Sequence, residues 1–257
     1  MLAAVASGKK TKAVRNARSV VSATKPKPYG TVAAVVAVVL FTGVVFGFLY
    51  FQYDQGRTER EALAAFQPTA ERQDPAAQIP DVTVQRYDAA GHVAPTERVA
   101  YQAFPPFGGP HDGIWAQCAG TVYDVPVRNE NMVHSLEHGA VWIAYNPDQV
   151  TGEALQSLQA RVQGQDYLML SPYPGLESAV SLQSWGHQLM VASADDPRID
   201  QFIRALRLNQ YTYPEVGASC EIPADAFDPA SPPPFNSAPP GPDAKPMDYN
   251  AGRGAGG

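Results

Sequence analysis

The sequence predicts an α+β domain with a mainly antiparallel sheet and helices packed on one face, preceded by a single transmembrane helix. Two observations predict this: an uncharged apolar run over residues 31–51, and strand-like runs interleaved with helix-like periodicity over 80–220. Short β-branched and aromatic runs predict strands near 82–86, 140–145, 167–171, 179–185 and 187–193. Apolar residues at helical spacing predict helices over 147–162 and 199–206. The order of a strand, a helix, three strands and a helix is typical of a layered α+β fold.

The run TVAAVVAVVLFTGVVFGFLYF at 31–51 is predicted to span a membrane. At about 1.5 Å per residue it is long enough to cross a hydrocarbon core of about 30 Å. A cleaved signal peptide is the alternative, but such peptides have an apolar core of only about 7–15 residues and end at small residues. This run ends in the bulky residues Phe48, Leu49, Tyr50 and Phe51. A signal anchor in the cell membrane therefore fits better.

Charge predicts the orientation of this anchor and excludes one class of partner. Residues 1–30 hold seven cations and no acid, so the positive-inside rule places the N-terminus in the cytoplasm and the later residues outside it. We expect this basic arm to lie on the anionic lipid bilayer. The rest of the chain carries 12 cations against 25 acids, which would repel a phosphate backbone. No nucleic-acid partner is expected.

The region outside the membrane divides by composition into three parts. Residues 52–79 are polar and broken by proline, which predicts a stalk. Residues 80–220 carry the predicted strands and helices and form the extracytoplasmic domain. Residues 221–257 contain nine prolines and finish in AGRGAGG, a composition that predicts a disordered tail.

All five histidines fall between positions 92 and 187, at His92, His111, His134, His138 and His187. His134 and His138 are four residues apart, so they share a face of either a helix or a strand. Gly139 is expected to end a helix there. Neutral imidazole is the commonest metal ligand, and these histidines therefore predict a site for copper or zinc. The alternative is that each imidazole only hydrogen-bonds a backbone carbonyl.

The residues beside these histidines extend the hypothesis. His111 and Asp112 stand on the loop PPFGGPHDG, whose prolines and glycines can hold a ligand rigidly. Glu137 and Asp112 are predicted to support the metal ligands by accepting their ring N–H groups. The string from His134 to His138 also matches the H-x-x-E-H pattern of zinc hydrolases, a less favoured alternative because Gly139 stops the helix.

Cys118 and Cys220 are the only cysteines, and both lie in the predicted outer region. An oxidising compartment favours one disulfide between them, closing a loop of about a hundred residues. The alternative is that Cys118 serves as a thiolate ligand for copper near His111.

The function predicted from these features is a membrane-anchored extracytoplasmic domain that binds copper or zinc and has no catalytic residues. The alternative is a non-catalytic interaction module, an accessory subunit that docks on a membrane complex of the cell envelope. An anchor, a stalk and a tail would serve either function.

A series of motifs over about 100–220 resembles the bacterial domain-of-unknown-function family 3105 (DUF3105). These motifs are PPFGGPH, the W-x-x-C-x-G that follows it, NENMVHSLEHGAVWIAY, LSPYPGL, SWG and PEVGASC. The resemblance implies a single-pass envelope protein of the kind found in actinobacteria, with no established activity. The family pattern includes His111, Cys118, His134, Glu137, His138 and Cys220. Phe107 and Gly108 replace the usual Thr and Ser, which argues against a role for a hydroxyl group there.

Overall fold

The computed structural model describes residues 29–88, 91–223 and 225–250. Helix α1 (Tyr29–Ala64) contains the whole predicted span at 31–51, and an 18-residue window within it has a mean hydropathy of 2.7. Among the described residues, α1 is the one helix long and apolar enough to cross a membrane. The predicted basic arm lies almost wholly outside the described residues. The chain divides into two compact units, 1–56 and 57–257.

The second unit is an α+β domain built on a mostly antiparallel sheet of six strands in the order β1-β8-β7-β5-β6-β4. Its strands are β1 (Thr83–Val84), β4 (Ala119–Val122), β5 (Val141–Tyr145), β6 (Leu168–Pro172), β7 (Val180–Ser184) and β8 (His187–Val191). The β1/β8, β8/β7 and β7/β5 pairs are antiparallel, whereas β5/β6 and β6/β4 are parallel. This confirms the predicted fold class, and five of the strands coincide with predicted ones. Strand β4 was not predicted.

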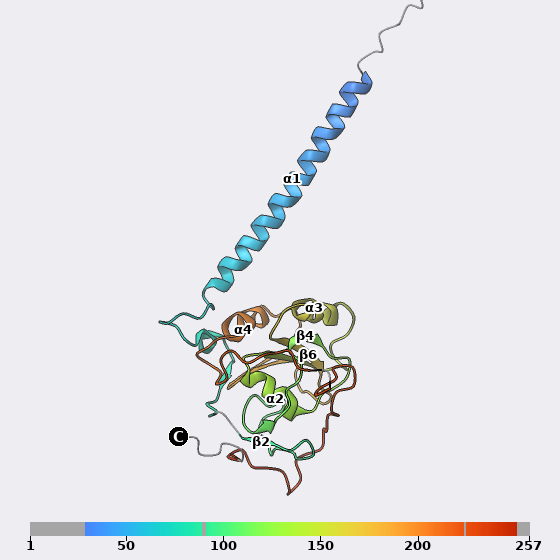
Figure 1. The fold of residues 1–257 in the computed structure, drawn as a ribbon. Coiled ribbons are helices and arrows are strands. Elements are labelled where there is room, and N and C mark those ends of the chain that lie inside the picture. Colours follow the sequence, from blue (N-terminus) through green and yellow to red (C-terminus); the bar gives the residue numbers. More distant parts are fainter. Residues whose placement is uncertain (1–28, 89–90, 224, 251–257) are drawn as a thin grey trace, which may run out of the picture. The chain divides into compact units, whose positions relative to one another are not determined.

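Helices cover both faces of this sheet. Val141, Ile143 and Tyr145 of β5 face the apolar cluster formed with α3 (Gly152–Val162) and α4 (Arg198–Leu206). The alternate residues Trp142 and Ala144 face the cluster formed with α2 (Asn129–Glu137). Figure 1 shows α3 and α4 on one side of the sheet and α2 on the other. The expected single helical face therefore holds for the two predicted helices and is wrong for α2, because every residue of β5 is buried and both faces need cover.

A second, very small sheet lies beside α2. Strands β2 (His92–Val93) and β3 (His111–Asp112) pair in parallel, with His92 opposite His111. β3 packs against α2. This pairing brings two histidines that are 19 positions apart in the sequence to the helix that contains His134 and is capped by His138.

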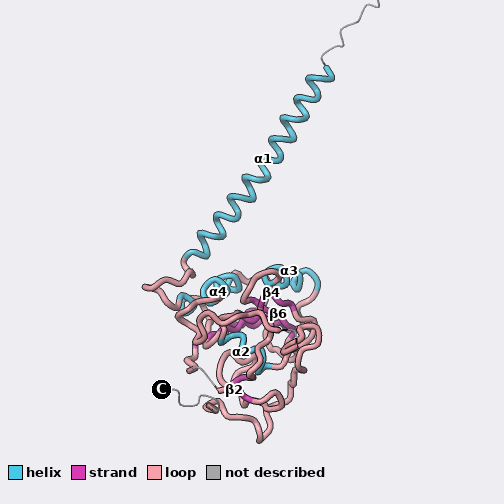
Figure 2. The backbone as a smooth tube through the Cα atoms, viewed as in Figure 1, coloured by secondary structure: helices cyan, strands magenta, loops and turns pink. Residues whose placement is uncertain are grey.

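The segments that flank the predicted domain pack onto it. The 3₁₀-helix η1 (Pro75–Gln78) lies within the predicted stalk. Even so, Ala76 and Ile79, the residue that follows η1, are buried in the apolar cluster formed with α3 and α4. The described part of the tail, 221–223 and 225–250, also differs from the prediction of disorder: Phe227 is 3% exposed, and Pro234 pairs with Val127, whereas residues 224 and 251–257 of the predicted tail lie outside the described residues. Burial of Phe227, together with the partly buried Phe235 and Tyr249, offsets an ordering cost that composition alone predicts will dominate. Figure 2 shows that much of the chain around the sheet is loop.

Two adjacent residues of β8 test this packing. Leu189 is fully buried in the apolar cluster that includes α3 and α4, whereas Met190 points to the other face of the strand and is 41% exposed. We expect Leu189→Ala to lower the free energy of unfolding by about 2–5 kcal/mol. Met190→Ala should change it by about 0.5 kcal/mol or less. Urea denaturation of the purified full-length chain measures both, and equal losses would contradict this register.

Candidate metal centre

His111 lies at the start of β3 and is completely buried. Its Nδ1 is 2.9 Å from the carbonyl oxygen of Gly109. A carbonyl can only accept a hydrogen bond, so Nδ1 carries a proton and Nε2 is the ring nitrogen that faces the cluster. That Nε2 is 2.8 Å from Oε2 of Glu137, which is also buried.

His134 stands in the middle of α2 and repeats this arrangement. Its Nδ1 donates to the carbonyl oxygen of Asp112 at 2.6 Å, which leaves Nε2 to face the cluster. Burial, together with the neighbouring rings of His111 and His138, lowers the pKa of His134 to about 2. The ring is therefore neutral at physiological pH, which is the form that binds a metal ion.

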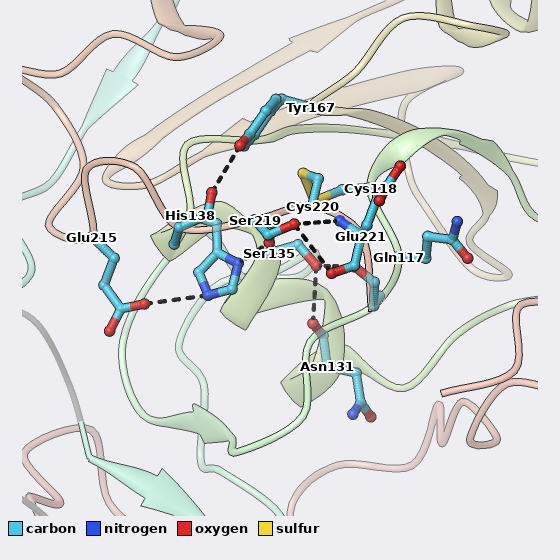
Figure 3. Close-up of a disulfide and its surroundings, with 12 residues drawn as sticks. Gln117, Cys118, Asn131, Ser135, His138, Tyr167, Glu215, Ser219, Cys220 and Glu221 are labelled. Atoms are coloured by element: carbon cyan, nitrogen blue, oxygen red, sulfur yellow. Dashed lines mark hydrogen bonds and ion pairs between the residues drawn. A yellow bond between two sulfur atoms is a disulfide. The ribbon is translucent and has the colours of Figure 1, made fainter. Parts of the chain in front are cut away.

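His138 follows the last helical residue and acts as the C-cap of α2. Its Nδ1 donates to the carbonyl of Ser219 at 2.7 Å, and its Nε2 is 3.2 Å from Oε2 of Glu215 (Figure 3). Burial lowers the pKa of His138, although the Ser219 carbonyl and the Glu215 carboxylate oppose the shift. The helix ends here because Gly139, as predicted, takes a φ of 93°.

His92 completes the cluster at its exposed edge. Its ring stacks on that of His134 with centroids 5.0 Å apart, and it lies 5.1 Å from the ring of His111. Partial burial and the neighbouring His111 lower the pKa of His92.

These side chains form two groups of metal-ligating atoms. His92, His111, His134 and Glu137 make the first, which we call the inner group; His134, His138 and Glu215 make the second, the outer group. Within each group the ligand atoms lie within 4.8 Å of one another. Bonds of about 2.0–2.1 Å to a tetrahedral ion would place them about 3.3 Å apart, so shifts on the order of 1 Å would close either group on an ion.

Polar contacts in the inner group are incomplete. Oε1 of Glu137 is buried without a hydrogen-bond partner, and among the described residues Nε2 of His111 is matched only by Oε2 of Glu137, 2.8 Å away. Unsatisfied buried polar atoms are rare and costly, and an ion is one of the partners that satisfies them. The donor set of neutral imidazoles and a carboxylate fits a transition-metal ion.

A buried ionic network holds the loop that carries His111. The guanidinium of Arg128 contacts the carboxylate of Asp112 and lies 3.2 Å from that of Glu130. The other oxygen of Asp112 accepts from the backbone N–H of Ile114 at 2.8 Å. Asp112 therefore supports His134 through its backbone carbonyl, while its carboxylate fastens the loop.

The structure places two other predicted residues apart from both groups. His187 lies at the start of β8, where its Nδ1 donates to the carbonyl of Trp185 and its Nε2 is 3.1 Å from the carboxylate of Asp74. Both of its ring nitrogens are engaged, and it belongs to neither ligand group. Cys118 is joined to Cys220 in a disulfide, as predicted, which removes the alternative of a thiolate ligand.

Two features of the site go beyond what the spacing of histidines indicated. Glu137 lies among the ligand atoms themselves, facing His111, whereas the prediction gave it a supporting position. Glu215 was not predicted at all, although it stands in the PEVGASC motif that carries the family resemblance. A carboxylate in such a motif, five positions before the disulfide cysteine, was the signal that could have identified it.

The fold and the site together define an α+β domain that carries a histidine and carboxylate cluster and follows a single apolar helix. Residues 92–222 match the model of a family described as a protein of unknown function (DUF3105). The match covers about half of the chain, which belongs to this family and thereby confirms the predicted resemblance. Neither a curated protein nor a solved structure matches the chain.

Arg128 offers a test of the network that positions the cluster. We expect Arg128→Ala to lower the free energy of unfolding by about 3–5 kcal/mol, because it leaves the buried carboxylates of Asp112 and Glu130 without their cation. Arg86→Ala is the control, since Arg86 and its partner Asp88 are both more than 90% exposed. Its effect should be about 1 kcal/mol or less. Equal losses in the free energy of unfolding, measured by urea denaturation, would show that the buried network does not provide this stabilisation.

Proposed function

We propose that this domain binds a divalent transition-metal ion through the inner group, with Nε2 of His111 and of His134 as the central ligands. The observation that carries the proposal is the shared arrangement of these imidazoles. Each donates its Nδ1–H to a backbone carbonyl and turns its Nε2 toward the others. Metal-ligating histidines generally have their second nitrogen held in this way. His92 and Glu137 supply the remaining ligands.

The donor set favours zinc(II) or copper(II). Thiolate ligands select copper(I), and both cysteines are held in the disulfide. Imidazole and carboxylate donors suit the divalent ions. Glu137 adds one negative charge to three neutral rings, which leaves a bound dication with a net charge of about +1 in a largely buried site.

Calorimetric titration of the full-length chain, purified without a histidine tag, tests this function. We expect zinc(II) or copper(II) to bind more tightly than copper(I), with a Kd at or below about 1 µM. A His111→Ala/His134→Ala double variant should weaken binding by about 100-fold or more, because it removes two ligands. His187→Ala is the control, since His187 is buried but lies outside the ligand groups.

The outcomes of this titration separate the candidate functions. Binding that survives intact in a folded double variant would place the site elsewhere. Absence of binding at micromolar metal in the parent chain would overturn the metal function and leave the interaction module, an accessory subunit of an envelope membrane complex, as the better hypothesis.

We further propose that α1 anchors the domain to the cell membrane with the N-terminus in the cytoplasm. The apolar helix and the seven cations that precede it support this topology. A disulfide in the domain also favours an oxidising compartment outside the cytoplasm.

Cysteine labelling on intact cells tests this topology. Ser237 is exposed on the described part of the tail, so we expect Ser237→Cys to react with a membrane-impermeant thiol reagent. Ser7→Cys, in the basic arm, should react only after the membrane is permeabilised. The reverse labelling pattern, with both variants present in the membrane fraction, would show that the chain has the opposite orientation.

A further inference from the structure

The inner and outer groups share one ligand, His134. Its Nδ1 is committed to the carbonyl of Asp112, 2.6 Å away, so only Nε2 can bind a metal ion. One lone pair binds one ion at a time. The two groups are therefore alternative positions for a single ion, and His134 belongs to the ligand set in both positions.

The carboxylates of the two groups differ in their access to water. The inner group contains His111 and Glu137, whose side chains are 0% and 2% exposed. The outer group contains Glu215, whose side chain is 45% exposed and carries a negative charge. A hydrated cation from solution therefore meets an accessible carboxylate at the outer group before it reaches the buried carboxylate of the inner one.

The outer group is held in place by the segment from Tyr213 to Cys220. The backbone N–H of Glu215 donates to the carbonyl of Glu137 at 3.2 Å, and the ring of Tyr213 packs directly over Gly139, where a Cβ atom would collide with it. At the other end of the segment, Tyr167 donates to the carbonyl of Ala218, and Cys220 is joined to Cys118 (Figure 3). Glu215 thus extends from a fastened loop, which fits a built site.

We infer that His134, His138 and Glu215 form a loading site for the inner group, an inference that rests on the proposed function. A divalent transition-metal ion first exchanges its bound water for the Glu215 carboxylate, the His138 imidazole and Nε2 of His134. It then exchanges Glu215 and His138 for His111, Glu137 and His92 while His134 remains bound. Only ligands are exchanged, with no change in oxidation state.

The test measures rates of copper(II) binding to the full-length chain. Trp115 lies 4.7 Å from the ring of His138 and 5.5 Å from that of His134, so quenching of its fluorescence reports binding in a stopped-flow experiment. An EDTA chase gives the dissociation rate. A loading site lies on the path and is empty at equilibrium, so Glu215→Gln should lower the association and dissociation rates together, by about tenfold, and leave the Kd nearly unchanged.

Three variants make the interpretation specific. His138→Ala should repeat the effect of Glu215→Gln. Glu221→Gln removes an exposed charge next to the disulfide and should change the rates far less. His111→Ala should raise the Kd, mainly through faster dissociation, because it removes a ligand of the resting ion.

Three results would overturn the loading site. An association rate for Glu215→Gln equal to that of Glu221→Gln would mean that the ion enters directly beside the exposed His92. A raised Kd with an unchanged association rate would make Glu215 a ligand of the resting ion. Two copper ions bound per chain would contradict the sharing of His134. Failure of the parent chain to bind copper(II) or zinc(II) is a different result, since it overturns the proposed function itself.

Discussion

The candidate site depends on three backbone carbonyls that accept hydrogen bonds from imidazole rings. The carbonyls of Gly109, Asp112 and Ser219 each bind Nδ1–H of one histidine, at 2.6–2.9 Å. These bonds fix both the tautomer and the direction of each ring, so that the Nε2 atoms face one another. Carbonyls in a rigid backbone hold this geometry better than mobile side chains would, and the architecture around the site keeps those three carbonyls in place.

Helix α2 is buried along its whole length, so the polar groups of this helix need partners inside the domain. All nine residues of this helix are buried, polar ones included. Burying a polar group costs free energy unless it is hydrogen-bonded, and burying a charge costs more. Arg128 and Glu130 meet this demand through ion pairs, and Ser135 donates to the carbonyl of Ala116. Oδ1 of Asn129 and Oε1 of Glu137 remain without a hydrogen-bond partner, and the Glu137 oxygen, which lies among the imidazoles of the inner group, points to an ion.

Much of the fold could be predicted because local patterns decide it. The strands from Val141 to Val191 and the helices α3 and α4 have strong periodicity and clear ends, and the structure has them within a few residues of the expected limits. Strand β4 and the pair β2 and β3 escaped prediction because they are two to four residues long and exist only through their partners. The packing of the tail was not predicted for a related reason: its few aromatic residues gain from burial only once the domain provides a surface to receive them.

The sequence by itself determined the apolar helix, the fold class, the cysteine pair and the candidate ligands His134 and His138, because each rests on a short-range pattern or a simple count. Only the tertiary structure decided that His92 and His111 join them, that His187 does not, and that Glu215 lies beside His138. These residues come from segments as much as 123 positions apart. The physical reason is that ligand geometry depends on distances of a few ångströms across strand pairing, helix packing and a disulfide, and no local pattern encodes those distances.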